Sequence, residues 1–127
     1  MDTALRVNAA AEAFMGFGFL LVPSTVIPDL AANGVTTTRV FGSALLSLAL
    51  ISAMAGDLSD RLRPVVARFV QARVAQANLV FHVVGGCCLG MAGGTFLPPA
   101  VLHLVLTVLL CWAIPWSEIN WRRPDKE

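Results

Sequence analysis

The most constraining feature of the sequence is an uncharged stretch, residues 78–96, in which 19 consecutive positions carry no formal charge. As an α-helix rising ~1.5 Å per residue, it reaches ~28 Å, about the hydrocarbon thickness of a bilayer. Composition agrees, because 57% of the 127 residues are hydrophobic and 13% are charged, against ~25% charged in an ordinary soluble domain. The stretch therefore predicts a helix that spans a membrane.

Three further apolar runs accompany this stretch, and prolines, glycines or charged residues separate them. We therefore expect an all-α fold, a single transmembrane domain over residues 1–127 built as an up-down-up-down four-helix bundle. The expected spans lie at about residues 4–22, 40–55, 76–96 and 100–116.

The segments between and after the spans carry most of the polar residues. An amphipathic extension at residues 65–77, with valines and Phe69 opposite Arg68 and Gln71, is expected to lead into the third span. The three threonines at 36–38 offer caps for the second span, and 23–38 is either a plain connector or a lid. A polar tail follows at 117–127.

Positive charge is distributed unevenly over the two ends of such a bundle. Of nine Lys and Arg residues, Arg39 alone falls at the end opposite the termini. Because cytoplasmic loops carry an excess of Lys and Arg, both termini are expected to face the cytoplasm. The eight residues at that end are Arg6, Arg61, Arg63, Arg68, Arg73, Arg122, Arg123 and Lys126.

Several function classes lack their sequence signatures. No basic cluster is interleaved with aromatic residues, so no nucleic-acid partner is expected. The glycine-rich run at 85–94 lies inside an apolar helix and does not form a phosphate loop, and no metal motif is present. We expect no cofactor and no metal, and we interpret Cys87, Cys88 and Cys111 as small packing residues.

The third span presents a face of small residues. Gly86, Gly90 and Gly94 recur at every fourth position, which favours close approach of another helix. That helix belongs either to this chain or to a second copy, so the expected partners are membrane lipid and a homo-oligomer formed through these glycines.

A candidate acid–base pair lies within the spans. Glu12 and His82 both fall ~6–8 Å inside the cytoplasmic edge of parallel helices, and burying ionisable groups in a bilayer is costly unless they find partners. We predict that they pair and act as catalytic groups on a lipophilic small molecule, in a pocket that opens toward the cytoplasmic leaflet. The expected substrate-binding residues are Asn8, Asn78, His103, Met54 and Trp112, with His103 entering from the opposite side.

The layout resembles the DoxX-like group of small four-helix membrane proteins. The resemblance is carried by the early Arg6, a first span that ends before Pro23, and the run Thr-Arg-Val-Phe-Gly at 38–42 that opens the second span. That group includes quinone-associated oxidoreductase subunits, so the resemblance implies a lipophilic ligand. In size and plan the chain is also similar to small integral-membrane hydrolases and cyclases of secondary metabolism.

Two functional hypotheses follow from these features. The first is a membrane-embedded enzyme that uses Glu12 and His82 for isomerisation, cyclisation or epoxide opening. The second is a non-catalytic subunit that binds a quinone or lipid, or that assembles with another protein through the glycine face. In a third interpretation, Glu12 and His82 only join helices through interhelical hydrogen bonds, each worth ~1 kcal/mol or less.

Overall fold

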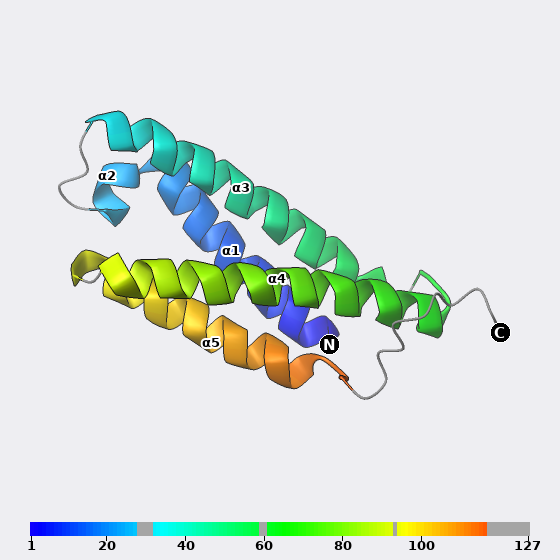
Figure 1. The fold of residues 1–127 in the computed structure, drawn as a ribbon. Coiled ribbons are helices and arrows are strands. Elements are labelled where there is room, and N and C mark those ends of the chain that lie inside the picture. Colours follow the sequence, from blue (N-terminus) through cyan, green and yellow to red (C-terminus); the bar gives the residue numbers. More distant parts are fainter. Residues whose placement is uncertain (28–31, 59–60, 93, 117–127) are drawn as a thin grey trace.

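The computed structural model describes residues 1–27, 32–58, 61–92 and 94–116. Within these ranges the chain is helical and contains no strand, which confirms the all-α prediction (Figure 1). The elements are α1 (Asp2–Leu21), α2 (Pro23–Val26), α3 (Ala32–Gly56), α4 (Pro64–Ala92), the 3₁₀ helix η2 (Gly94–Phe96) and α5 (Leu97–Ala113).

Three of the described helices are long and apolar enough to cross a membrane. The segments are Asp2–Leu21, Gly34–Gly56 and Pro64–Met91, of 20, 23 and 28 residues. Helix α5 is also apolar, but it is shorter, with 17 residues. Length and composition thus support the predicted membrane protein.

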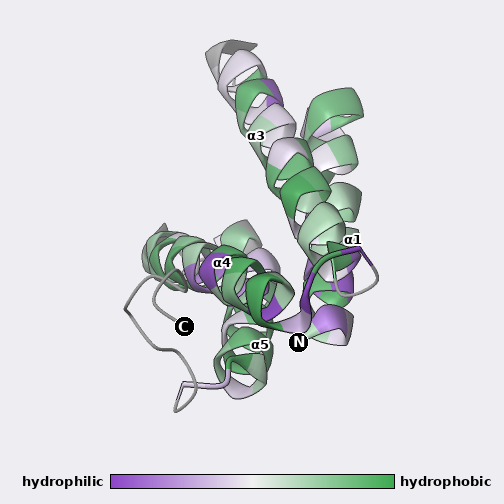
Figure 2. Ribbon diagram, turned by 90° about the vertical axis from the view of Figure 1, so that its right-hand side faces the viewer, coloured by the Kyte–Doolittle hydropathy of each residue, from purple (hydrophilic) through white to green (hydrophobic). Residues whose placement is uncertain are grey.

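The helices expose many large apolar side chains and enclose a group of polar ones, unlike those of a typical water-soluble protein. Large apolar side chains such as Phe14, Val80, Met91 and Leu104 are exposed on the outside of the helices, where Figure 2 shows mostly hydrophobic colour. Polar side chains are instead enclosed, as expected where lipid and not water is the solvent. The buried polar residues are Asn8, Glu12, Thr38, Ser52, Gln71, Asn78, His82 and His103.

The helices pack as two hairpins, α1 with α3 and α4 with α5, which lie on opposite sides in Figure 2. In the first hairpin two glycines meet. A Cβ built on Gly42 would lie 2.8 Å from the carbonyl oxygen of Gly16, so only glycine permits this spacing. In the second hairpin, Gly85 and Gly86 make room for His103 of α5.

The hairpins converge at the end where α1 begins and diverge toward the opposite end (Figure 1). At the converging end a small apolar cluster fills the interior and brings all four long helices together. Small and branched side chains allow this close approach. The cluster consists of Leu5, Ala55, Ala75, Leu110 and Ile114.

Several helix boundaries differ from those expected. Helix α3 begins at Ala32, so the threonines at 36–38 lie inside the helix and do not cap it. The extension at 65–77 is continuous with the third span in α4, which begins at Pro64, a residue suited to the first helical turn. The segment 23–38 contains α2, and the tail 117–127 lies outside the described residues.

The predicted faces of the extension are corrected by the structure. Val65 and Val66 are exposed, whereas Gln71 is buried and donates a hydrogen bond to the carbonyl oxygen of Ala55 at 2.9 Å. The buried face is made of small residues, Ala67 and Ala75 among them. The predicted apolar face is thus not the buried face, which instead contains small residues and Gln71.

Candidate functional site

Each long helix contributes one inward stripe at helical spacing, and the polar side chains of the site belong to these stripes. In α4 the stripe runs through Ala67, Gln71, Ala75, Asn78 and His82, spaced by three or four residues. Asn8 and Glu12 occupy the stripe of α1, Ser52 that of α3, and His103 that of α5. The polar side chains therefore meet in the interior, between the four helices.

Ser52 is the centre of the buried hydrogen-bond network. Its hydroxyl accepts hydrogen bonds from the side-chain amides of Asn8 at 3.3 Å and of Asn78 at 2.8 Å. The same hydroxyl donates to Oε2 of Glu12 at 3.4 Å. One serine on α3 thus connects α1 with α4.

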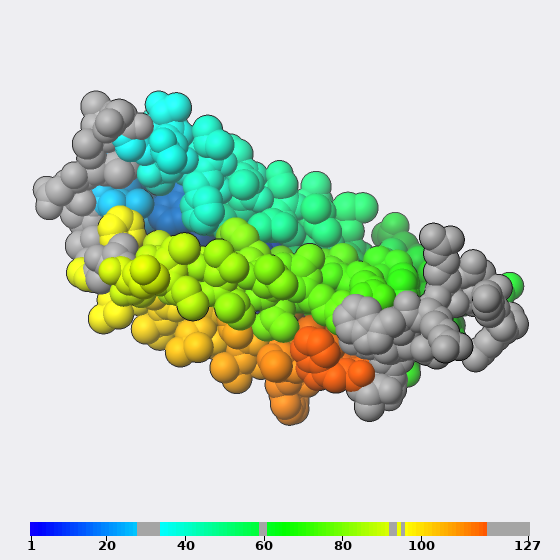
Figure 3. Space-filling view, viewed as in Figure 1, coloured from blue at the N-terminus to red at the C-terminus, as the bar shows by residue number. Residues whose placement is uncertain are grey.

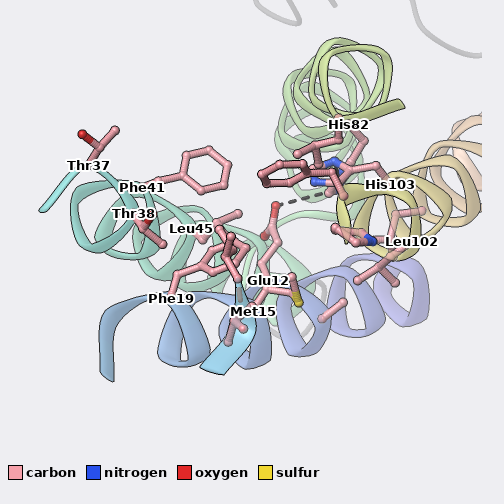
Figure 4. Close-up of a pocket in the computed structure, with 17 residues that line it drawn as sticks. Glu12, Met15, Phe19, Thr37, Thr38, Phe41, Leu45, His82, Leu102 and His103 are labelled. Carbon is pink, nitrogen blue, oxygen red and sulfur yellow. Dashed lines mark hydrogen bonds and ion pairs between the residues drawn. The ribbon is translucent and has the colours of Figure 1, made fainter. Parts of the chain in front are cut away.

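Glu12 and His82 lie side by side, as Figure 4 shows, but they are not joined by a direct hydrogen bond. Nε2 of His82 is 3.7 Å from Oε1 of Glu12 and 2.6 Å from Oδ1 of Asn8. The hydrogen bond from Nε2 of His82, which was expected to go to Glu12, goes to Asn8 instead. Oε1 of Glu12 is left buried without a hydrogen-bond partner among the described residues.

His103 completes the cluster. Its Nδ1 lies 3.0 Å from Nδ1 of His82, and the two rings meet edge to face with centroids 5.0 Å apart. The prediction that these histidines lie at opposite depths is therefore wrong. The third span was expected to run to residue 96, whereas α4 ends at Ala92, ten residues after His82. The chain returns from Gly94, nine residues before His103, so the two histidines lie at similar distances from the turn.

A cavity of about 290 Å³ lies beside this cluster, between the diverging hairpins. Figure 3 shows a hollow between α3 and α4 there, with α1 at its floor. Glu12, His82 and His103 line the cavity, together with Thr37 and Thr38. The remaining wall is apolar and is made by Ala11, Met15, Phe19, Val26, Ile27, Phe41, Leu45, Leu89, Phe96, Pro99, Leu102 and Leu106.

The cavity lies in the half of the molecule away from the start of α1, whereas the pocket was expected near that end, on the side assigned to the cytoplasmic leaflet. The apolar cluster that contains Leu5 and Leu110 lies on the terminal side of Ser52 and closes the interior there. Val26 and Ile27, in and just after α2, line the cavity at the other end. The described residues Val26, Ile27, Thr37 and Thr38 of the segment 23–38 thus form part of the cavity wall.

Two predicted substrate-binding residues do not reach the cavity. The exposed fractions of Met54 and Trp112 are 62% and 85%, and both lie on the outside of their helices. Met54 is two positions, or ~200°, from buried Ser52, so the two cannot share a face. Trp112 stands in the same relation to buried Leu110.

Asn8 is hydrogen-bonded to His82 and Asn78 to Ser52, but neither asparagine lines the cavity. Of the predicted substrate-binding residues, His103 does line it. Cys87, Cys88 and Cys111 are exposed, which corrects their interpretation as packing residues.

Three residues that help to build the site were not predicted to do so. Ser52 was not among the predicted catalytic or substrate-binding residues, and nothing in its spacing marked it as the centre of a hydrogen-bond network. Gly85 accommodates His103, since a Cβ there would lie 2.9 Å from Cε1 of the imidazole. Phe81 contacts both histidine rings, at 5.3 and 5.6 Å between centroids.

Within the described ranges, no group of three or more His, Cys, Asp or Glu side chains is placed to hold a metal ion. Comparison of the chain with protein-family models, with curated proteins and with solved structures finds no match. The functional argument therefore rests on the geometry of the site.

Proposed function

We propose that this chain is a membrane-embedded enzyme that carries out acid–base chemistry on a lipophilic small molecule. The observation that carries the proposal is the carboxyl group of Glu12, which is 2% exposed, has an unpartnered Oε1 and lines an apolar cavity beside two imidazoles. Burying such a group in a membrane span costs free energy, and an ionisable residue there is a typical mark of a functional site. Isomerisation, cyclisation and epoxide opening all fit an acid placed in this way.

The reaction is tested by changing the carboxyl group alone. We expect wild-type protein in lipid nanodiscs to convert at least one member of a panel of lipophilic epoxides, enones and unsaturated ketones, followed by mass spectrometry. Glu12→Gln keeps the shape of the side chain and removes its acid–base function, so the rate should fall ~100-fold or more.

The matched control is Asp57→Asn, which makes the same chemical change at an exposed carboxylate. Asp57 is 2.8 Å from Arg6, in an ion pair at the terminal end of the molecule. Its substitution should leave the rate unchanged. Equal rates for wild type and Glu12→Gln would rule out the catalytic role of Glu12.

The proposed enzyme crosses the membrane four times, with both termini in the cytoplasm. Helix α5 adds a fourth span to the three long ones, because an apolar helix of 17 residues is at the lower limit for crossing. Arg6, Arg61, Arg63, Arg68 and Arg73 belong to the end at which α1 begins, and Arg39 to the other, which supports the orientation.

Reporter fusions test this orientation. A C-terminal reporter that is active only in the cytoplasm should be active, and its periplasmic counterpart inactive, when the chain is expressed in a bacterial inner membrane. The same reporters joined after α2 should give the reverse result. Periplasmic activity at the C-terminus would contradict the proposed topology.

A second candidate function is a non-catalytic subunit that binds a lipid or quinone and assembles through its glycine face. One observation favours assembly: a Cβ built on Gly90 would meet no atom within 4 Å, and neighbouring Met91 is exposed. Gly86, however, already contacts His103 and Ala100 within the chain. Gly94 lies in η2 with φ +56°, outside α4. Gly90 is thus the one member of the predicted triplet left open on α4.

A further inference from the structure

The hydrogen bonds around His82 fix the positions of their protons. An amide oxygen can only accept, so Nε2 of His82 carries the proton that is donated to Oδ1 of Asn8 at 2.6 Å. The orientation of the Asn8 amide is consistent with this, because its nitrogen donates to Ser52. In neutral His82, Nδ1 must then be an acceptor.

The tautomer of His103 follows from that of His82. Because the two Nδ1 atoms are 3.0 Å apart and that of His82 is an acceptor, Nδ1 of His103 must carry a proton and donate it. In neutral His103 the lone pair is then on Nε2. This atom has no hydrogen-bond partner in the part of the chain that the structure describes, and His103 lines the cavity.

We infer that His103, and not His82, is the proton acceptor that faces the substrate, and that His82 is a positioning residue that holds His103 in the tautomer with a free Nε2. This inference rests on the proposed function and deepens it. Both ring nitrogens of His82 are occupied by protein partners, whereas His103 keeps one nitrogen free. Gly85 supports the arrangement by leaving room for the imidazole.

The substrate class follows from this assignment. A proton leaves a weakly acidic O–H, or a C–H beside a carbonyl, and goes to Nε2 of His103, while the electron pair stays on the substrate. His103 becomes an imidazolium that still donates from Nδ1 to His82. Return of the proton to a different atom of the same molecule completes an isomerisation, which needs no second reactant.

The cavity volume sets a scale for the ligand. A cavity of ~150 Å³ accepts benzene, so a cavity of about 290 Å³ matches a molecule about twice as large, such as 2-naphthol. This compound carries one weakly acidic O–H on an apolar frame. It is therefore a suitable probe, and naphthalene is its matched control without the O–H group.

The tautomers can be measured without a substrate, by ¹⁵N NMR of histidine-labelled protein in bicelles. The chain contains two histidines, so the single variants His82→Phe and His103→Phe assign every ring resonance. We expect His82 to be protonated at Nε2 and His103 at Nδ1. A His103 protonated at Nε2 in the wild type would overturn the inference.

Two substitutions of His82 separate positioning from packing. In His82→Asn the new amide oxygen can still accept from Nδ1 of His103, so His103 should keep its tautomer. In His82→Phe no acceptor remains, and the proton should move to Nε2 of His103. Retention of the Nδ1 proton in His82→Phe would overturn the positioning role of His82.

Addition of 2-naphthol should shift the Nε2 resonance of His103 and leave Nε2 of His82 nearly unchanged, while naphthalene shifts neither nitrogen. A larger shift at His82, or no shift at His103, would show that the free acceptor does not face the cavity. These readouts do not depend on turnover. Correct tautomers with no rate loss in Glu12→Gln would reject the proposed enzyme alone, and wrong tautomers with normal rate loss would reject this inference alone.

Discussion

Replacement of Ser52 by alanine is expected to lower the free energy of unfolding by about 2–3 kcal/mol. The substitution removes one hydroxyl but three hydrogen bonds, to Asn8, Asn78 and Glu12. Interhelical hydrogen bonds in membrane proteins are each worth ~0.6–1 kcal/mol or somewhat more. Because Ser52 is fully buried, water cannot replace the lost partner.

Ser47→Ala on the same helix is the matched control. The Ser47 hydroxyl is exposed and donates only to the carbonyl oxygen of Ser43, one turn earlier, at 3.1 Å. Its loss should change stability by less than ~0.5 kcal/mol. Both variants can be compared by SDS titration in mild detergent, followed by circular dichroism. Equal midpoints for Ser52→Ala and wild type would show that the network does not stabilise the helices.

The helical fold was predictable because the sequence separates cleanly into apolar runs and breakers. Three local features indicate where the helices lie: the length of each apolar run, prolines at helix starts such as Pro64, and the glycines of the third span. The inward faces were harder to predict. In lipid large apolar side chains can face outward, so an apolar face such as that of Val65 and Val66 does not by itself indicate which side of a helix is buried.

The members of the polar cluster were largely predictable, whereas their connections were not. Glu12, His82 and Asn78 stand out because polar residues are rare inside apolar spans. The hydrogen-bond partners of these side chains depend on the register between helices and on the angle at which the two hairpins diverge. No local sequence pattern encodes either of these. An expected third span that ended four residues too late therefore separated His82 from His103, which are in contact.

Replacement of Gly42 by alanine is expected to destabilise the protein by about 3 kcal/mol, the upper part of the range for overpacking. The added Cβ would lie 2.8 Å from the carbonyl oxygen of Gly16 and 2.8 Å from the backbone nitrogen of Leu20. A flexible side chain can move aside, but these are backbone atoms inside α1. Helices α1 and α3 must therefore separate, and the cavity wall that contains Phe19 and Phe41 must change with them.

Gly90→Ala tests whether the loss of stability in Gly42→Ala comes from the steric contact of the new Cβ or from replacing any helical glycine by alanine. Both positions lie within long helices, where alanine has the higher intrinsic helix propensity by up to ~1 kcal/mol. Propensity alone therefore predicts that both substitutions stabilise the protein. Because a Cβ on Gly90 meets nothing within 4 Å, Gly90→Ala should be neutral or slightly stabilising, whereas Gly42→Ala should unfold at a lower SDS fraction. If both variants unfolded like wild type, α1 and α3 would not approach as closely at Gly16 as the structure has them.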